Sequence, residues 1–252
     1  MSNAPSELGR ALIEARREAR LTHLDLALAP ADIAAAMRVQ REVLEAVGAS
    51  VAGWKVGYTP EGSPVAAPIY AGVTHKSGAT LRHGPSRKSG IEVEIALLLG
   101  RDLPPRPGRP YDRAEILDAG RAVLAGVEIV ASRFPDSPKP PFLIAVADNM
   151  GNGGYVPGKA VDGFRSLDLS KLRARLTIDG RKMHDAIGGH AKGDPLSPII
   201  DYVNRPCDIL GGLRAGQIVT TGSLSGCPYV EGAVHIVAEV EGLGEIELRF
   251  KP

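Results

Sequence analysis

The apolar residues at the start of the chain recur at helical spacing. Between residues 8 and 19, leucines and alanines repeat every three or four positions, and charged residues occupy the remaining faces, as is typical of an amphipathic helix. A second helix is predicted to begin near Pro30, since proline is tolerated in a first helical turn, and to end at Gly48. Residues 1–50 are therefore a predicted helical segment.

From residue 51 onward, apolar and polar residues alternate in short runs that are broken by glycine and proline, which indicates strands. The dipeptide Asp179-Gly180 predicts a hairpin between two such runs. The predicted strands are Val51–Tyr58, Glu92–Leu99, Gly126–Val130, Ala174–Ile178, Gln217–Thr221, Ala233–Val240 and Glu245–Phe250.

Two further helices are expected between the strands. One begins at Asp112, where Glu115 completes a capping-box pattern, and is expected to run to Gly126. The other lies near Leu196–Leu210. Together these elements predict an α+β fold, with a helical segment at 1–50 and a larger mixed-sheet domain at 51–252.

Composition narrows the class of protein. The 252 residues are 44% hydrophobic, which is enough for a sizeable core. Lys and Arg (30) almost balance Asp and Glu (29), so we expect neither a nucleic-acid partner nor an anionic membrane partner. Uninterrupted apolar runs such as Ile95–Leu99 are far too short to cross a bilayer. Cys207 and Cys227 are expected to be reduced thiols, which favours a cytoplasmic location.

Candidate chemistry begins with acids inside a predicted strand. Glu92 and Glu94 are two residues apart, so their carboxylates share one face about 6.5–7 Å apart along the strand. That face is apolar immediately afterwards, which places the acids at the margin of a core. Two ionised carboxylates there are costly unless a cation or a proton compensates them. A hard divalent ion, Mg²⁺ in particular, meets that need with oxygen ligands.

A third acid repeats the pattern. Glu128 lies inside the apolar segment 126–130 and would complete a Mg²⁺ or Mn²⁺ site with open positions. Each acid taken singly is better explained as an exposed strand residue that is paired to a lysine. The three together favour a metal site, because glutamate is depleted in strand interiors.

A lysine in the first strand is a candidate for catalysis. Lys55 shares a strand face with Gly53 and Gly57, and glycines within strands often mark the close approach of a ligand or of backbone. Such a lysine could polarise a carbonyl or relay a proton. A surface lysine that extends its amine into water explains the same pattern equally well.

A series of short motifs makes the sequence recognisable. They are Gly-Trp-Lys-Val-Gly-Tyr-Thr (53–59), Ile-Glu-Val-Glu-Ile-Ala (91–96), Val-Glu-Ile-Val-Ala-Ser-Arg (127–133), Val-Ala-Asp-Asn (146–149), Gly-Asp-Pro-Leu (193–196), Gly-Ser-Leu (222–224) and Gly-Leu-Gly (242–244). In this order and spacing the set resembles the 2-keto-4-pentenoate hydratase and 4-oxalocrotonate decarboxylase branch of the fumarylacetoacetate hydrolase superfamily.

The resemblance implies a mixed β-roll catalytic domain and a homo-oligomer. It implies a divalent metal, Mg²⁺ or Mn²⁺, held by Glu92, Glu94 and Glu128, with Lys55 as the residue that polarises the substrate or relays a proton. In such enzymes the metal chelates a short 2-oxo acid and stabilises its enolate, so that water adds to a 2-hydroxy-2,4-dienoate. Matching positions near the family's substrate pocket are Thr59, Asp148 and Ser223.

The expected activity is therefore that of a metal-dependent hydratase of the kind used in aromatic meta-cleavage degradation. A decarboxylase of oxalocrotonate-like acids, an acylpyruvate C–C hydrolase and a catalytically weak 2-oxo-acid-binding subunit are the alternatives. Two departures from the family pattern leave the substrate open. Gly151 stands where relatives commonly have a pocket serine, and an acid common after the first glycine-rich strand is replaced near His75.

Overall fold

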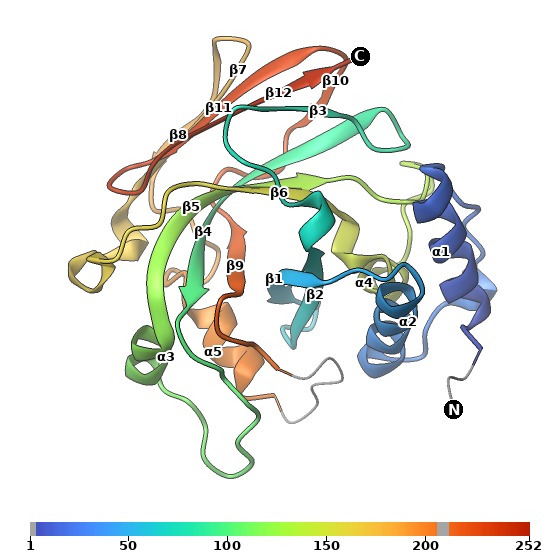
Figure 1. The fold of residues 1–252 in the computed structure, drawn as a ribbon, viewed down its shortest axis with the longest axis horizontal. Helices are drawn as coiled ribbons and strands as arrows, with labels where there is room; N and C mark the ends of the chain where they lie inside the picture. Colours follow the sequence, from blue (N-terminus) through green and yellow to red (C-terminus); the bar gives the residue numbers. More distant parts are fainter. Residues whose placement is uncertain (1–3, 206–211) are drawn as a thin grey trace.

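The computed structural model describes residues 4–205 and 212–252. Figure 1 shows two helices at one side of the molecule and a smaller sheet at its top, with long strands running between them. The helices are α1 (Glu7–Glu18), α2 (Ile33–Ala46), α3 (Arg113–Ala119), α4 (Phe142–Ala147) and α5 (Ser197–Val203). The strands are β1 (Val51–Tyr58), β2 (Pro64–Tyr70), β3 (Ala79–Arg82), β4 (Lys88–Leu99), β5 (Gly120–Val130), β6 (Asn152–Pro157), β7 (Arg173–Ile178), β8 (Arg181–Ile187), β9 (Ile218–Ser223), β10 (Tyr229–Glu231), β11 (Val234–Val240) and β12 (Gly244–Lys251).

The two predicted N-terminal helices form as α1 and α2. Ser6 and Asp32 cap them by accepting hydrogen bonds from backbone N–H groups of the first turn. Their apolar faces join the same core as the sheets, since Leu12 of α1, Val43 of α2 and Trp54 of β1 belong to one cluster of buried side chains. Gln40 is also buried, and its amide donates to the carbonyl oxygens of Ala66 and Val146. The division of the chain at residue 50 stays a prediction.

Seven strands form the larger sheet, in the order β2-β1-β9-β4-β5-β6, with β10 paired to β4. Thr74, just after β2, bridges Tyr155 of β6, so the two edges of this curled sheet approach each other. The smaller sheet has the order β3-β12-β11-β7-β8. The hairpin predicted at Asp179-Gly180 is confirmed as the β7–β8 turn.

One predicted helix was too long. Asp112 and Glu115 form the capping box, but α3 ends at Ala119 and β5 begins at Gly120. Residues 121–125 are compatible with a helix, yet residues 122–125 pair with β4, and this pairing overrides local propensity. The helix predicted near Leu196–Leu210 is present as the shorter α5, which ends at Val203. Residues 206–210 of that prediction lie outside the described residues.

Strands β2, β3, β6 and β10 were not predicted. β2 contains Pro64 and Pro68, which argue against a strand, but it lies at the edge of the sheet, where a missing backbone donor is tolerated. β6 begins with Asn152 and two glycines, which normally indicate a loop. Within the described residues, none of the helices combines the length and the apolar character needed to cross a membrane.

Candidate metal centre and active site

Strand pairing brings the three predicted acids together. Glu92 of β4 lies directly opposite Glu128 of β5, and Glu94 is two residues further along the same face. One carboxylate oxygen from each residue lies within 4.8 Å of the others. Glu94 and Glu128 are fully buried, whereas the Glu92 side chain is 18% exposed. The cluster is therefore open to solvent on the side of Glu92.

Lys55 extends from β1 into this cluster. Its Nζ donates to Glu128 Oε1 at 2.8 Å and to the Met150 carbonyl oxygen at 3.3 Å, and it lies 3.7 Å from Glu92 Oε2. Burial disfavours the charged amine, but the carboxylates of Glu128 and Glu92 outweigh burial and raise the pKa of Lys55. Lys55 is thus an ammonium ion held among carboxylates, not a lysine that extends into water.

The hydrogen bonds leave specific oxygens free for a cation. Glu128 Oε1 accepts from Lys55 and from the Asn152 amide, whereas Glu128 Oε2 and both oxygens of Glu94 are buried with no hydrogen-bond partner among the described residues. Burial, and then the charges of Glu128 and Glu92, raises the pKa of Glu94 well above its ordinary value. With all four groups ionised, the single ammonium would leave two negative charges uncompensated. An all-oxygen donor set with this deficit fits a hard divalent cation.

Tyr155 is a member of the site that the sequence did not indicate. It lies opposite Glu128 on β6, and its hydroxyl is fully buried and has no hydrogen-bond partner among the described residues. A Cβ at Gly126 would collide with this hydroxyl, so glycine is required there. Burial, and then the charges of Glu94 and Glu128, raises the pKa of Tyr155. Tyr155 therefore stays protonated and can donate a hydrogen bond. The sequence analysis missed Tyr155 because the two glycines that precede it normally indicate a loop and not a strand.

The turn at residues 149–151 has a constrained backbone. Asn149, Met150 and Gly151 have φ values of 54°, 52° and 73°, a conformation that costs free energy for residues with a side chain. This turn presents the Met150 carbonyl to Lys55. Gly151 lies at the third left-handed position, and glycine adopts that conformation most easily.

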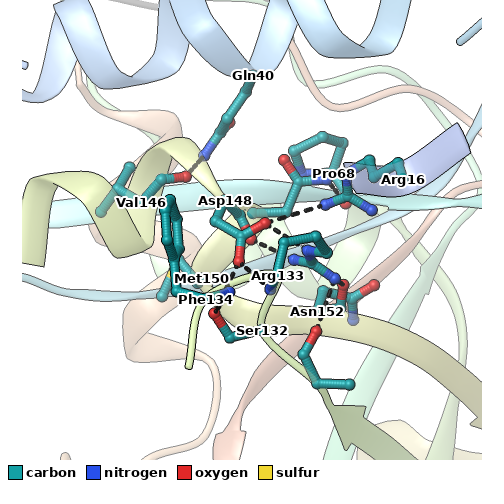
Figure 2. Close-up of polar contacts among 12 residues, drawn as sticks. Arg16, Gln40, Pro68, Ser132, Arg133, Phe134, Val146, Asp148, Met150 and Asn152 are labelled. Carbon is teal, nitrogen blue, oxygen red and sulfur yellow. Dashed lines mark hydrogen bonds and ion pairs between the residues drawn. The ribbon is translucent and has the colours of Figure 1, made fainter. Parts of the chain in front are cut away.

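A buried ion pair lies behind the turn, as Figure 2 shows. The Arg133 guanidinium contacts the Asp148 carboxylate through Nε, and its Nη1 donates to the Asn152 carbonyl at 2.9 Å. The Asp148 carboxylate also accepts from the Arg133 backbone N–H at 2.9 Å and from the Ser132 hydroxyl at 3.0 Å. Asn152 in turn holds Glu128. The Arg133–Asp148 pair therefore supports Asn152, which in turn positions the Glu128 carboxylate.

The three predicted substrate-binding residues occupy different surroundings. Asp148 is 1% exposed, and its carboxylate is bonded to Arg133 and Ser132. Thr59 is buried in the turn after β1, where its hydroxyl accepts from two backbone N–H groups. Ser223 pairs with Glu94 across β9 and β4, so of the three it lies nearest the carboxylates along the sheet. A contact with substrate stays a prediction for Thr59, Asp148 and Ser223.

Asp148→Asn should destabilise the protein by about 3–5 kcal/mol, because it leaves the buried Arg133 guanidinium without its counter-charge. Urea unfolding followed by circular dichroism measures this loss. Asp162→Asn, which changes an exposed acid in the same way, is the matched control and should lie within about 0.5 kcal/mol of the unmodified protein. Equal stability of the two variants would contradict the supporting role of the pair.

Cys227 is a free thiol at the edge of the cluster, whereas Cys207 lies outside the described residues. Burial, and then the charge of Glu92, raises the pKa of Cys227 to about 12. The thiolate is the reactive form, so at pH 8 iodoacetamide should alkylate Cys227 about a thousandfold more slowly than an unperturbed thiol. Mass spectrometry of the Cys227 peptide measures the rate, with free cysteine as the control. A rate near that of free cysteine would contradict the burial of this thiol.

The chain is similar to known proteins in sequence and in fold. A 2-keto-4-pentenoate hydratase from Paraburkholderia phymatum is 29% identical over 224 residues, which cover 86% of this chain and 84% of the relative. The solved 4-oxalocrotonate decarboxylase from Pseudomonas putida G7, complexed with magnesium and adipate, shares the fold with a TM-score of 0.84 at 22% identity, over 96% of this chain and 95% of that one. Fumarylpyruvate hydrolase from Pseudomonas aeruginosa, complexed with Mn²⁺ and pyruvate, superimposes with a TM-score of 0.56 at 16% identity, over 79% of this chain and 88% of that one.

The family assignment rests on a match that spans most of the chain. Residues 31–251 match the family described as Fumarylacetoacetate (FAA) hydrolase C-terminal. This range begins just before α2 and includes all three acids, Lys55 and the supporting ion pair. The chain therefore belongs to the fumarylacetoacetate hydrolase C-terminal family, as the motifs predicted.

Proposed function

We propose that this enzyme is a divalent-metal-dependent hydratase that adds water to a 2-hydroxy-2,4-dienoate. The observation that carries the proposal is the set of buried carboxylate oxygens without hydrogen-bond partners, beside a charged lysine. The residues that would hold the metal are Glu92, Glu94 and Glu128. A bound Mg²⁺ or Mn²⁺ would supply Lewis-acid stabilisation of negative charge on the substrate oxygens.

The chain's own groups supply charge and protons around the substrate. Lys55 holds a proton on Nζ between Glu128 and Glu92, so it can donate a hydrogen bond to a substrate oxygen or pass a proton to a substrate carbon. Tyr155 provides a second buried donor without a competing partner among the described residues. The apolar side chains of Ile69, Ala96 and Leu124 pack with Tyr155 and exclude water from the floor of the site.

The relatives support hydration and leave decarboxylation as the competing reaction. The hydratase from P. phymatum aligns with most of this chain, whereas the decarboxylase from P. putida G7 is alike in fold. Both reactions need charge stabilisation at the same oxygens, so the acids and Lys55 do not distinguish them. Homo-oligomeric assembly, a cytoplasmic location and a place in aromatic catabolism stay predictions.

The test is an assay with freshly generated 2-hydroxypenta-2,4-dienoate in the presence of Mg²⁺, Mn²⁺ or a chelator. We expect metal-dependent loss of the dienol absorbance and a product whose mass has increased by one water. If this substrate is unchanged with either metal, while an oxalocrotonate-type acid loses CO₂, the enzyme is a decarboxylase. If acylpyruvates alone are cleaved, it is a hydrolase. If 2-oxo acids bind without turnover, it is a binding subunit.

A further inference from the structure

A cavity lies outside the carboxylate cluster and shares none of its residues. It has a volume of about 600 Å³ and is bounded by α1, β3, the segment after β2 and the ends of β5 and β6. Ile129 lines it, and because Ile129 follows Glu128 in β5, the two side chains point to opposite faces of the sheet. The cavity is therefore separated from the candidate metal centre by the sheet itself.

The cavity wall carries positive charge only. Its described lining includes Arg16, Arg17, Arg82 and Arg133, together with His75, and contains no aspartate or glutamate. A site of this size with arginines on several sides attracts an anion. The wall also has apolar residues, among them Val73 and Leu81, which a bare inorganic ion would leave without a partner.

Arg16 is the part of the wall that most needs a counter-ion. Its Nη2 lies 3.6 Å from Asp148 Oδ1, but Nε and Nη2 are both buried and have no hydrogen-bond partner among the described residues. Asp148 is already bonded to Arg133, so two guanidinium groups share one carboxylate, as Figure 2 shows. This leaves one buried positive charge uncompensated, which is costly in a protein interior. Burial, and then the charge of Arg133, lowers the pKa of Arg16 to about 10.

A buried tyrosine ring lies next to Arg16. Tyr70 is 6% exposed, lines the cavity, and its hydroxyl has no hydrogen-bond partner among the described residues. The Arg16 guanidinium carbon lies 5.1 Å from the centre of the Tyr70 ring. Guanidinium and hydroxyl donors together are the groups that bind a carboxylate head.

We propose that this cavity is a binding site for a small organic carboxylate, with its head group on Arg16 and Tyr70 and its apolar body against Val73 and Leu81. A second carboxylate on the same ligand would lie within reach of the exposed arginines of the wall, so a dicarboxylate should bind more tightly than a monocarboxylate. The site does not depend on the proposed hydratase activity or on metal.

The test is calorimetric titration of protein freed of metal on a chelating resin and kept in chelator-free buffer, with glutarate, pentanoate and inorganic phosphate as probes. We expect one site per chain, with a Kd for glutarate below about 1 mM, weaker binding of pentanoate and still weaker binding of phosphate. Tyr70→Phe keeps the ring and removes only the hydroxyl, and it should weaken glutarate binding about tenfold. Arg16→Gln should weaken it further.

Two controls locate the bound anion. Arg41→Gln removes an exposed arginine of α2 that does not line the cavity, and it should bind glutarate as the unmodified protein does. Glu94→Gln alters the carboxylate cluster and should also leave glutarate binding intact. If Arg16→Gln fails to fold, Tyr70→Phe decides.

Three results would overturn the site. One is the absence of binding at about 10 mM of every probe. Another is an unchanged affinity for glutarate in Tyr70→Phe. If Glu94→Gln alters the affinity in that case, the anion binds at the carboxylate cluster. The third is tighter binding of phosphate than of glutarate, which would overturn the organic class of the ligand.

Discussion

Glu94→Gln should abolish metal-dependent turnover, with a loss of about a thousandfold or more in kcat/KM. Both Glu94 oxygens are buried without hydrogen-bond partners among the described residues, so they are the oxygens freest to bind a cation. An amide has the same shape but lacks the negative charge that a hard divalent ion requires. Metal affinity, measured by calorimetric titration of Mg²⁺ or Mn²⁺, should fall more than about a hundredfold.

This variant should keep its fold. Glu94 lies beside two other carboxylates, and replacing it removes a repulsion that burial strengthens. The metal-free variant should therefore melt no lower than the metal-free parent at neutral pH. Glu239→Gln is the matched control, since Glu239 is a half-exposed strand acid paired with Arg175 at 2.7 Å, and its activity should be unchanged. Full activity of Glu94→Gln would end the metal assignment.

Lys55→Met should lower kcat by about two to four orders of magnitude while metal affinity is unchanged or tighter. The loss follows from removal of a proton carrier beside the reacting atoms. Metal affinity should not fall, because the ammonium competes with a cation for Glu128 and Glu92. Steady-state kinetics at saturating metal and a separate metal titration give the two quantities.

The same substitution has a second effect that only a lysine inside the cluster would produce. Without metal, loss of the ammonium leaves the Glu128 charge uncompensated, and the free energy of unfolding should fall by about 3–5 kcal/mol. Added metal should restore much of that loss. Lys182→Met, the control, removes an exposed lysine paired with Asp185 and should change stability by at most about 1 kcal/mol. If Lys55→Met leaves turnover unchanged, Lys55 is only a strand residue.

The acids were predictable from sequence because strand geometry has a simple period. Glu92 and Glu94 share a face wherever the strand lies, and their position in an apolar run indicated a compensating charge. What spacing could not supply was the register between strands. The pairing of Glu92 with Glu128, and the passage of β9 between β1 and β4, result from contacts between residues far apart in the chain.

Asp148 shows what a motif match cannot specify, namely the partners of the matched side chain. Its motif predicted a position near the pocket, and the structure places it two residues before Met150, whose carbonyl contacts Lys55. Its carboxylate is nevertheless occupied by Arg133, a partner fifteen residues earlier whose side chain returns to it only in the folded protein. The helix predicted to run to Gly126 was wrong for a related reason, since pairing with β4 overrode local propensity.

By itself the sequence determined the α+β class, the first two helices, most strands of the sheets, the family and the candidate acids, because these follow from local periodicity and short motifs. Only the tertiary structure decided that Lys55 lies between Glu92 and Glu128, that Tyr155 joins them, and that Arg16 and Tyr70 line a basic cavity behind the sheet. The physical reason is that charge compensation and burial are properties of side chains brought together across the fold. The order of residues along the chain does not specify which buried group will lack a partner.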